Sequence, residues 1–205
     1  MTEDCQFPKI SRRFALSEFR IPVKYLPVYA ILFAYFIYAI CRYFALNGEY
    51  STVFWYIHGV VHEVGHVVTR WAGETICIFS GTIFQILTPI ACGIYFCCGR
   101  EKHASLMTVG WFGFALLDSA TYMKDAIEMR LQLVAPFVSS DELTHDWNWL
   151  FTHWGILHHA NAIGNAVAVI GVMAVALSLI LMAVAALPFQ WFKELKTPTN
   201  YNQES

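Results

Sequence analysis

The sequence predicts an all-α integral membrane protein, and three observations lead to that prediction. First, 57% of the 205 residues are hydrophobic and only 14% are charged, whereas about 25% of the residues in an ordinary soluble domain carry a charge. Second, a soluble globule of this size has too small an interior to hide so much apolar surface. Third, several apolar stretches are long enough to cross a bilayer as a helix, which takes about 20 residues. The same composition excludes an intrinsically disordered chain, and a formal net charge of −2 gives no basic face for nucleic acid.

We expect a single membrane domain over residues 1–205, built on five apolar segments. The segments lie at about 24–46, 50–71, 75–99, 104–125 and 158–190. A polar loop, 126–157, separates the fourth segment from the last and contains three tryptophans, which are typical of a membrane interface. The polar N-terminal stretch does not read as a cleavable signal peptide, so we expect the first segment to be an uncleaved anchor.

The positions of the basic residues leave two topologies open. Four Lys or Arg residues precede the first segment and Lys24 begins it, so we expect the N-terminus to be cytoplasmic, in a bacterial inner membrane. Four full spans with a re-entrant segment at 75–99 would return the later basic residues to the same side. The turn-like Ser80-Gly81-Thr82 and Pro89 suit such a segment where protein covers the backbone. The length of 75–99 favours the alternative of five full spans.

The second segment contains His62-Glu63-Val64-Gly65-His66, an HExxH sequence. Residues four apart share one helix face, so the two imidazoles can bind a single zinc ion. Glu63 is then placed to take a proton from a zinc-bound water. Ionisable side chains are costly inside a membrane and mark function by default. We therefore expect a zinc site with His62 and His66 as ligands and Glu63 as the catalytic base, the alternative being a polar network between helices.

A zinc site of this kind needs a third protein ligand, and the sequence offers four candidates. Asp118 is favoured because it is an acid within an apolar segment, where a carboxylate demands a partner. His145 or Asp146 in the polar loop and Asp125, seven residues after Asp118, are the alternatives. Each alternative also has a plainer role. Asp125 can pair locally at the surface, and His145 with Asp146 can cap a helix that starts near Trp147.

The HExxH sequence in a second membrane segment resembles the site-2-protease class of intramembrane zinc metallopeptidases. The resemblance implies that an aspartate of a later helix, within a Leu-Asp-Gly motif, completes the zinc site. Leu117-Asp118 stands in the matching region, with Ser119 where the class has glycine. The resemblance also implies that residues 75–89 guide the substrate. The HExGH pattern, the Gly/Gln/Pro-containing third segment and the His-Asp-Trp sequence are similar as well to a small family of bacterial membrane proteins without an assigned activity.

These observations predict a membrane-embedded zinc hydrolase, foremost a metallopeptidase that cleaves peptide bonds of a membrane protein within or at the bilayer. A lipid amidase would use the same zinc chemistry on a lipid substrate. A second cluster, His153, His158 and His159, raises the alternative of a di-iron lipid oxidase, but its spacing differs from the histidine boxes of that class. An interfacial polar face is the plainer interpretation of that cluster. Haem held between helices, for example by His58 and His158, would leave Glu63 without a role.

The last segment carries small and polar residues at helical spacing. Gly164 and Gly171 predict a close approach of another helix. Asn161 and Asn165, four residues apart, share one face and predict either packing between helices or a contact with substrate backbone. Gln85 of the third segment is open to the same two interpretations.

Overall fold

The structure is a computed structural model that describes residues 16–46, 52–131 and 144–187. No strand occurs in those three ranges, so the all-α prediction is confirmed for the part of the chain described. The helices are α1 (Leu26–Ala45), α2 (Val53–Thr69), α3 (Glu74–Cys98), α4 (Ala104–Lys124), α5 (Asp146–His153) and α6 (Ala160–Ala186). Short 3-10 turns flank them at Leu16–Phe19, Val23–Tyr25, Arg70–Ala72 and Leu157–His159.

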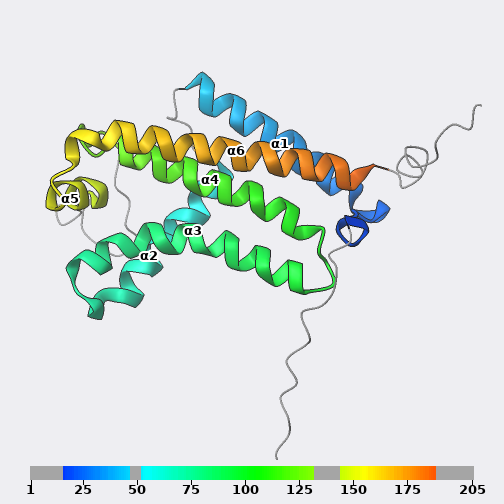
Figure 1. Ribbon diagram of the computed structural model, residues 1–205, viewed down its shortest axis with the longest axis horizontal. Helices are drawn as coiled ribbons and strands as arrows, with labels where there is room; N and C mark the ends of the chain where they lie inside the picture. The colour runs from blue at the N-terminus through cyan, green and yellow to red at the C-terminus, as the bar shows by residue number, and fades with distance from the viewer. Residues whose placement is uncertain (1–15, 47–51, 132–143, 188–205) are drawn as a thin grey trace, which may run out of the picture.

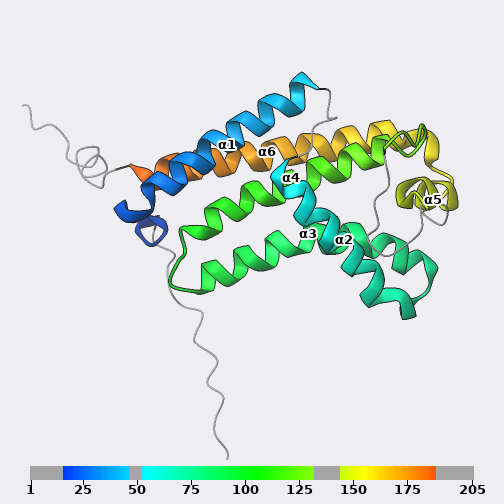
Figure 2. The same ribbon diagram turned by 180° about the vertical axis from the view of Figure 1, so that it is seen from behind.

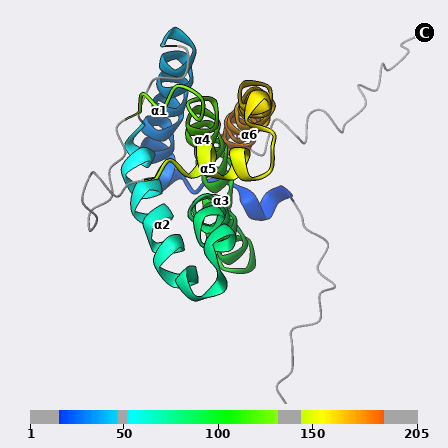
Figure 3. The same ribbon diagram turned by 90° about the vertical axis from the view of Figure 1, so that its left-hand side faces the viewer.

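Helix α4 lies at the centre of the bundle (Figures 1 and 3). It packs along α6 on one side and runs antiparallel to α3 on another, while α1 covers α6 and α2 lies against α3. The largest core cluster joins α1, α4 and α6, where the rings of Phe36 and Phe114 lie 5.1 Å apart beside Leu117, Val175 and Met182. Because α4 faces protein on most sides, most of its polar and small residues are buried inside the bundle.

Facing glycines bring α4 and α6 together. A Cβ atom at Gly113 would lie 2.7 Å from the Gly171 carbonyl oxygen, and one at Gly171 would lie 2.9 Å from the Gly113 carbonyl oxygen. A Cβ at Gly164 would lie 2.9 Å from the Ala120 carbonyl oxygen. Any side chain at these positions would force the two helices apart. The close helix approach predicted at Gly164 and Gly171 is therefore confirmed.

The bundle has two chemically different ends. At one end, which we call the basic end, the start of α1 meets the α3–α4 turn and the end of α6. The Ile21 amide donates to the Ala185 carbonyl oxygen at 3.2 Å, and the Tyr29 hydroxyl is hydrogen-bonded to His103 Nδ1 at 2.8 Å. At the opposite end, which we call the site end, α4 and α2 finish, α3 and α6 begin, and α5 is attached (Figure 1).

Helix α2 begins at mid-height rather than at an end of the bundle (Figure 2). The Val53 amide donates to the Tyr35 hydroxyl at 2.7 Å. The Phe54 ring packs 6.0 Å from that of Phe36 and 5.5 Å from that of Phe114, both near the middle of their helices. From there α2 runs to the site end, where His66 meets the first turn of α3. It therefore covers about half the height of the bundle, unlike α3, α4 and α6.

Three helices are long and apolar enough to cross a membrane, Val23–Ala45, Glu74–Cys98 and Leu157–Ala186. They coincide with the predicted segments 24–46, 75–99 and 158–190. The fourth segment, 104–125, is the continuous helix α4, and the second, 50–71, contains α2. Residues 50–51, 132–143 and 188–190 of the predicted segments and polar loop lie outside the described residues.

The turn expected within a re-entrant segment at 75–99 is not observed. Helix α3 is one continuous helix that runs from the site end to the basic end and contains Pro89. A proline inside a membrane helix is tolerated where neighbouring helices cover the weakened turn. Here Pro89 is fully buried, and one turn earlier the Gln85 amide donates to the Ala115 carbonyl oxygen of α4 at 3.1 Å. Gln85 therefore has a packing role between α3 and α4.

Candidate metal centre

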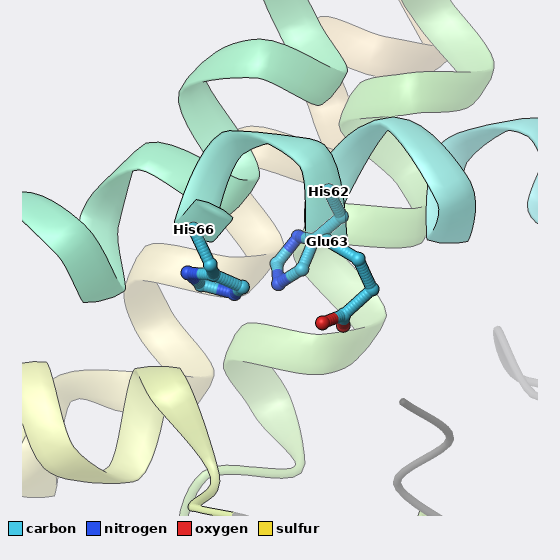
Figure 4. Close-up of side chains that lie close together, drawn as sticks. All are labelled: His62, Glu63 and His66. Atoms are coloured by element: carbon cyan, nitrogen blue, oxygen red, sulfur yellow. The ribbon is translucent and has the colours of Figure 1, made fainter. Parts of the chain in front are cut away.

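Helix α2 presents the HExxH side chains together at the site end. His62, Glu63 and His66 form the one group of three His, Cys, Asp or Glu side chains, among the residues that the structure describes, whose ligand atoms all lie within 4.8 Å of one another. Figure 4 shows all three projecting towards the same space. The two imidazole rings are 4.7 Å apart between centroids, and all three side chains are half-buried. The helical spacing thus produces the juxtaposition that the sequence predicts.

Two glycines fix how close α2 and α3 come at this point. A Cβ at Gly65 would lie 2.6 Å from the Ser80 carbonyl oxygen of α3. A Cβ at Gly81 would lie 2.6 Å from His62 Nε2 and 2.7 Å from its Cδ2 and Cε1. The bare backbone of α3 therefore forms a wall against which the His62 ring lies. Ser80 and Gly81, expected in a re-entrant turn, instead provide a helix surface flat enough for this contact.

The third group at the site comes from α5, and it is Asp146. One carboxylate oxygen, Oδ2, lies 2.7 Å from His62 Nε2 and 3.3 Å from His66 Nε2. The Asp146 side chain is 11% exposed. Its backbone N–H donates to the Tyr122 hydroxyl of α4 at 3.1 Å, which holds the start of α5 over the two histidines. The structure therefore brings the polar loop to α2.

The protonation of His66 is fixed by its other neighbour. Its Nδ1 lies 2.8 Å from the carbonyl oxygen of Cys77, and a carbonyl oxygen can only accept, so Nδ1 carries a proton. Its Nε2 faces the Asp146 carboxylate at 3.3 Å. A ring with a proton on both nitrogens donates to Asp146 from Nε2, whereas a neutral ring offers the Nε2 lone pair to a metal ion. A hydrogen bond from the second nitrogen to a backbone carbonyl is also the usual outer contact of a metal-binding histidine.

Zinc fits this donor set. Zinc bonds of about 2.0–2.2 Å at tetrahedral angles place neighbouring ligand atoms about 3.4 Å apart. The 3.3 Å from Asp146 Oδ2 to His66 Nε2 matches this spacing, whereas the 2.7 Å to His62 Nε2 is a direct hydrogen-bond distance that a bound metal ion would lengthen. Burial raises the pKa of the Asp146 carboxyl, but the hydrogen bonds and charges of His62 and His66 outweigh burial and hold the pKa below its ordinary value. Asp146 is therefore ionised, as a metal ligand must be.

In the structure Asp118 pairs with His58 and not with His62 or His66. Its Oδ2 lies 2.5 Å from His58 Nδ1, one turn before His62 on α2. The Trp111 indole N–H donates to His58 Nε2 at 2.9 Å, so His58 carries its proton on Nδ1 and donates to Asp118. The carboxylate within the apolar segment does have a partner, as its burial requires, but that partner is a histidine. The arrangement predicted for Asp118, a bond to the metal of His62 and His66, is not the one observed.

His145 and Asp125 hold the loop rather than the metal position. His145 is the N-cap of α5, and its Nδ1 accepts from the Asn148 amide at 3.2 Å while its Nε2 faces Asp125 Oδ2 at 3.3 Å. Burial lowers the pKa of His145, against the opposing effect of Asp125, so a neutral ring donates from Nε2. Asp125 also accepts the amides of Arg130 and Leu131. The capping role open to His145 and the local pairing open to Asp125 are the roles observed.

The second histidine cluster lies apart from the site. His153 stacks on Trp149 with ring centroids 4.8 Å apart, and the rings of His158 and His159 contact each other at 3.9 Å. All three are exposed. This placement agrees with an interfacial polar face and does not assemble a second metal site from the residues described.

Sequence reasoning does not single out Tyr122, nor the pairing of His58 with Asp118. Both have a helical signal. His58, His62 and His66 recur every four residues on α2, and Asp118 and Tyr122 do so on α4, so two polar stripes face each other across the helix interface.

No family model matches this chain, and no curated protein or solved structure is significantly similar to it. The chemistry of the site is therefore inferred from its own residues.

Proposed function

We propose that the protein is a membrane-embedded zinc hydrolase, with His62, His66 and Asp146 as the metal ligands. The observation that carries this proposal is the convergence of His62, Glu63 and His66 on one space, with the Asp146 carboxylate 3.3 Å from His66 Nε2. His62 Nε2 points at the same oxygen from 2.7 Å. Three ligands from the protein leave a fourth position open, as in catalytic rather than structural zinc sites.

Zinc bound there would supply a Lewis acid that polarises a carbonyl group and lowers the pKa of a water molecule. Glu63 provides the base. Its carboxylate lies within 4.8 Å of the ligand atoms of the two histidines, and it forms no ion pair with another residue that the structure describes. Glu63 takes the proton from the attacking water and passes it to the leaving nitrogen as the carbon–nitrogen bond breaks.

The substrate class follows from the surroundings of the site. Three helices are long and apolar enough to cross a membrane, and the metal centre lies at one end of the bundle they form (Figure 1). We infer an amide bond presented at the membrane surface or just below it, in a peptide segment of a membrane protein. An amide-linked lipid would meet the same residues.

A single metal centre favours hydrolysis over the alternative of a di-iron oxidase. Two irons need a larger set of histidine and carboxylate ligands, and His153, His158 and His159 are exposed elsewhere. Glu63, between two ligands, has a direct use in hydrolysis.

The experiment combines metal content with Glu63→Gln. Purified protein should carry about one zinc ion per chain, and Glu63→Gln should retain that zinc. In liposomes, wild type should cleave at least one of a set of fluorogenic single-span peptides or an N-acyl lipid, and Glu63→Gln should lose about 10²–10⁴-fold in rate. Stoichiometric iron without zinc, or unchanged cleavage by Glu63→Gln, would overturn the proposal.

A further inference from the structure

An open groove lies on the far side of α4 from the metal centre. Its volume is about 530 Å³, which is within the range of ligand sites. It runs between the end of α1, the last residue of α4 and the first half of α6, with Phe44, Val169 and Met173 among its apolar walls. These three side chains are 60%, 59% and 66% exposed, so the groove opens to the surroundings of the bundle.

The groove contains one charged residue, Lys124, and the fold makes room for it. The Lys124 side chain crosses α6 at Gly164, where a Cβ atom would lie 2.5 Å from Lys124 Cγ. Its ammonium group lies 5.8 Å from the centre of the Tyr43 ring, on α1. Lys124 forms no ion pair with any carboxylate in the part of the chain that the structure describes. The Lys124 side chain thus passes between α4 and α6 and places a positive charge in a mostly apolar groove.

A second polar group there also lacks a partner. The Tyr43 hydroxyl is buried and makes no hydrogen bond to another described residue. Asn165, exposed on α6, adds an amide to the same lining. Buried polar groups are normally hydrogen-bonded, so a tyrosine with an unsatisfied hydroxyl, whose ring centre lies 5.8 Å from an unpaired ammonium group, points to an anionic oxygen ligand in the groove.

We infer that this groove binds one acidic phospholipid. Two of its walls, α1 and α6, are among the helices apolar and long enough to span a membrane, so the groove faces lipid, and its apolar residues suit an acyl chain. Lys124 is the last residue of α4, which puts the charge at the end of the bundle, where headgroups lie. Its ammonium group would bind the phosphate diester, with Tyr43 and Asn165 as further hydrogen-bond partners. A net-negative lipid is favoured because, among the residues that the structure describes, the lining holds a lysine and no acidic residue that could bind a choline group.

This inference is independent of the proposed hydrolysis, since Lys124 faces α6 while the metal ligands lie between α2, α3 and α5. Its test is lipid binding by the whole protein, measured by native mass spectrometry with phosphatidylglycerol and phosphatidylcholine of the same acyl chains. Wild type should retain phosphatidylglycerol preferentially. Lys124→Gln should weaken phosphatidylglycerol binding about fivefold, the effect of one lysine at a membrane surface, and Lys124→Arg should preserve it.

Lys24→Gln is the matched control. Lys24 also lies over a tyrosine ring, that of Tyr25 at 4.6 Å, but at the basic end and outside the groove that Lys124 lines. It should leave the preference unchanged. Met173→Trp fills the groove from its exposed wall without changing a charge, and it should reduce the retention of both lipids. Equal binding of the two lipids by wild type, an unchanged preference in Lys124→Gln, or full lipid retention by Met173→Trp would each overturn the inference.

Discussion

At the scale of single residues, the His66 ring shows how the site is determined. Its Nδ1 donates to the Cys77 carbonyl group on α3, and its Nε2 faces Asp146 on α5. The backbone contact fixes a proton on Nδ1, so only Nε2 is left to bind a metal ion or to donate to Asp146. The proposed metal site thus depends on three helices meeting at one ring, as well as on the spacing of the two histidines.

The third ligand can be tested by exchanging single carboxylates. Asp146→Asn should reduce zinc affinity by more than the 10–100-fold typical of residues outside the ligand shell. Asp118→Asn should keep zinc close to one per chain and instead lower the thermal unfolding temperature, because it disrupts a buried pair with His58. Zinc content after dialysis against a chelator, together with thermal unfolding, measures both effects. Loss of zinc in Asp118→Asn but not in Asp146→Asn would restore the ligand set favoured by the sequence.

Tyr122 acts on the metal only through Asp146. Tyr122→Phe removes the acceptor of the Asp146 backbone N–H and loosens the first residue of α5 over α2. We expect zinc affinity to fall about tenfold, at the low end of the range for outer residues. Tyr35→Phe, which removes a similar acceptor from the Val53 amide at mid-height, is the control and should leave zinc affinity unchanged.

The sequence predicts the residues of the site that share one helix, and it does not predict those that a different helix supplies. The spacing of four residues is enough for His62 and His66, and Glu63 follows from the motif. The argument that a buried carboxylate needs a partner holds for Asp118, but two partners were open, a metal ion or His58. Which partner Asp118 meets depends on whether His58 or His62 lies level with it where α2 packs against α4. Hydropathy does not specify that register.

At the scale of elements, the contact between α2 and α3 shapes the site. Hydropathy predicts α1, α3, α4 and α6 because each has an apolar stretch of nearly its full length. It does not predict that α2 starts at mid-height, because that depends on Phe54 packing between the rings of Phe36 and Phe114. Glycines then let the two helices touch at the depth of the histidines.

Gly81→Ala tests this contact. The added methyl group would lie 2.6–2.7 Å from three atoms of the His62 ring, so the ring must move away from the metal position. We expect zinc affinity to fall by at least tenfold, on the scale of other supporting contacts, while the helix content stays unchanged. Gly59→Ala is the matched control on α2, since nothing lies within 4 Å of its added Cβ, and alanine is the better helix former. Equal zinc affinity in the two variants would show that the α3 backbone does not position His62.

At the scale of the whole molecule, α2 covers only about half the height of the bundle and so does not count as a pass between its two ends. This bears on where the basic residues lie. Helices α1, α3, α4 and α6 make an even number of passes between the two ends, so the start of α1, the α3–α4 turn and the end of α6 lie together. Most Lys and Arg residues precede α1, occupy that turn or follow α6, namely Lys9, Arg12, Arg13, Arg20, Lys24, Arg100, Lys102, Lys193 and Lys196. Basic residues mark the cytoplasmic side of a membrane protein, so we expect the proposed metal site on the opposite side.

Labelling of single cysteines checks this orientation. Arg100 is exposed in the α3–α4 turn at the basic end, and Glu128 is exposed beyond α4 at the site end. In a chain with all six native cysteines replaced by serine, a membrane-impermeant maleimide added to intact bacterial cells should label Glu128→Cys and spare Arg100→Cys. Permeabilised cells should label both, which shows that each position is reactive. Labelling of only Arg100→Cys would invert the orientation, and labelling of both in intact cells would contradict the even number of passes. With the expected result, the metal centre faces the outer side of the membrane, so a peptide substrate must reach it from that surface or through the outer half of the bilayer.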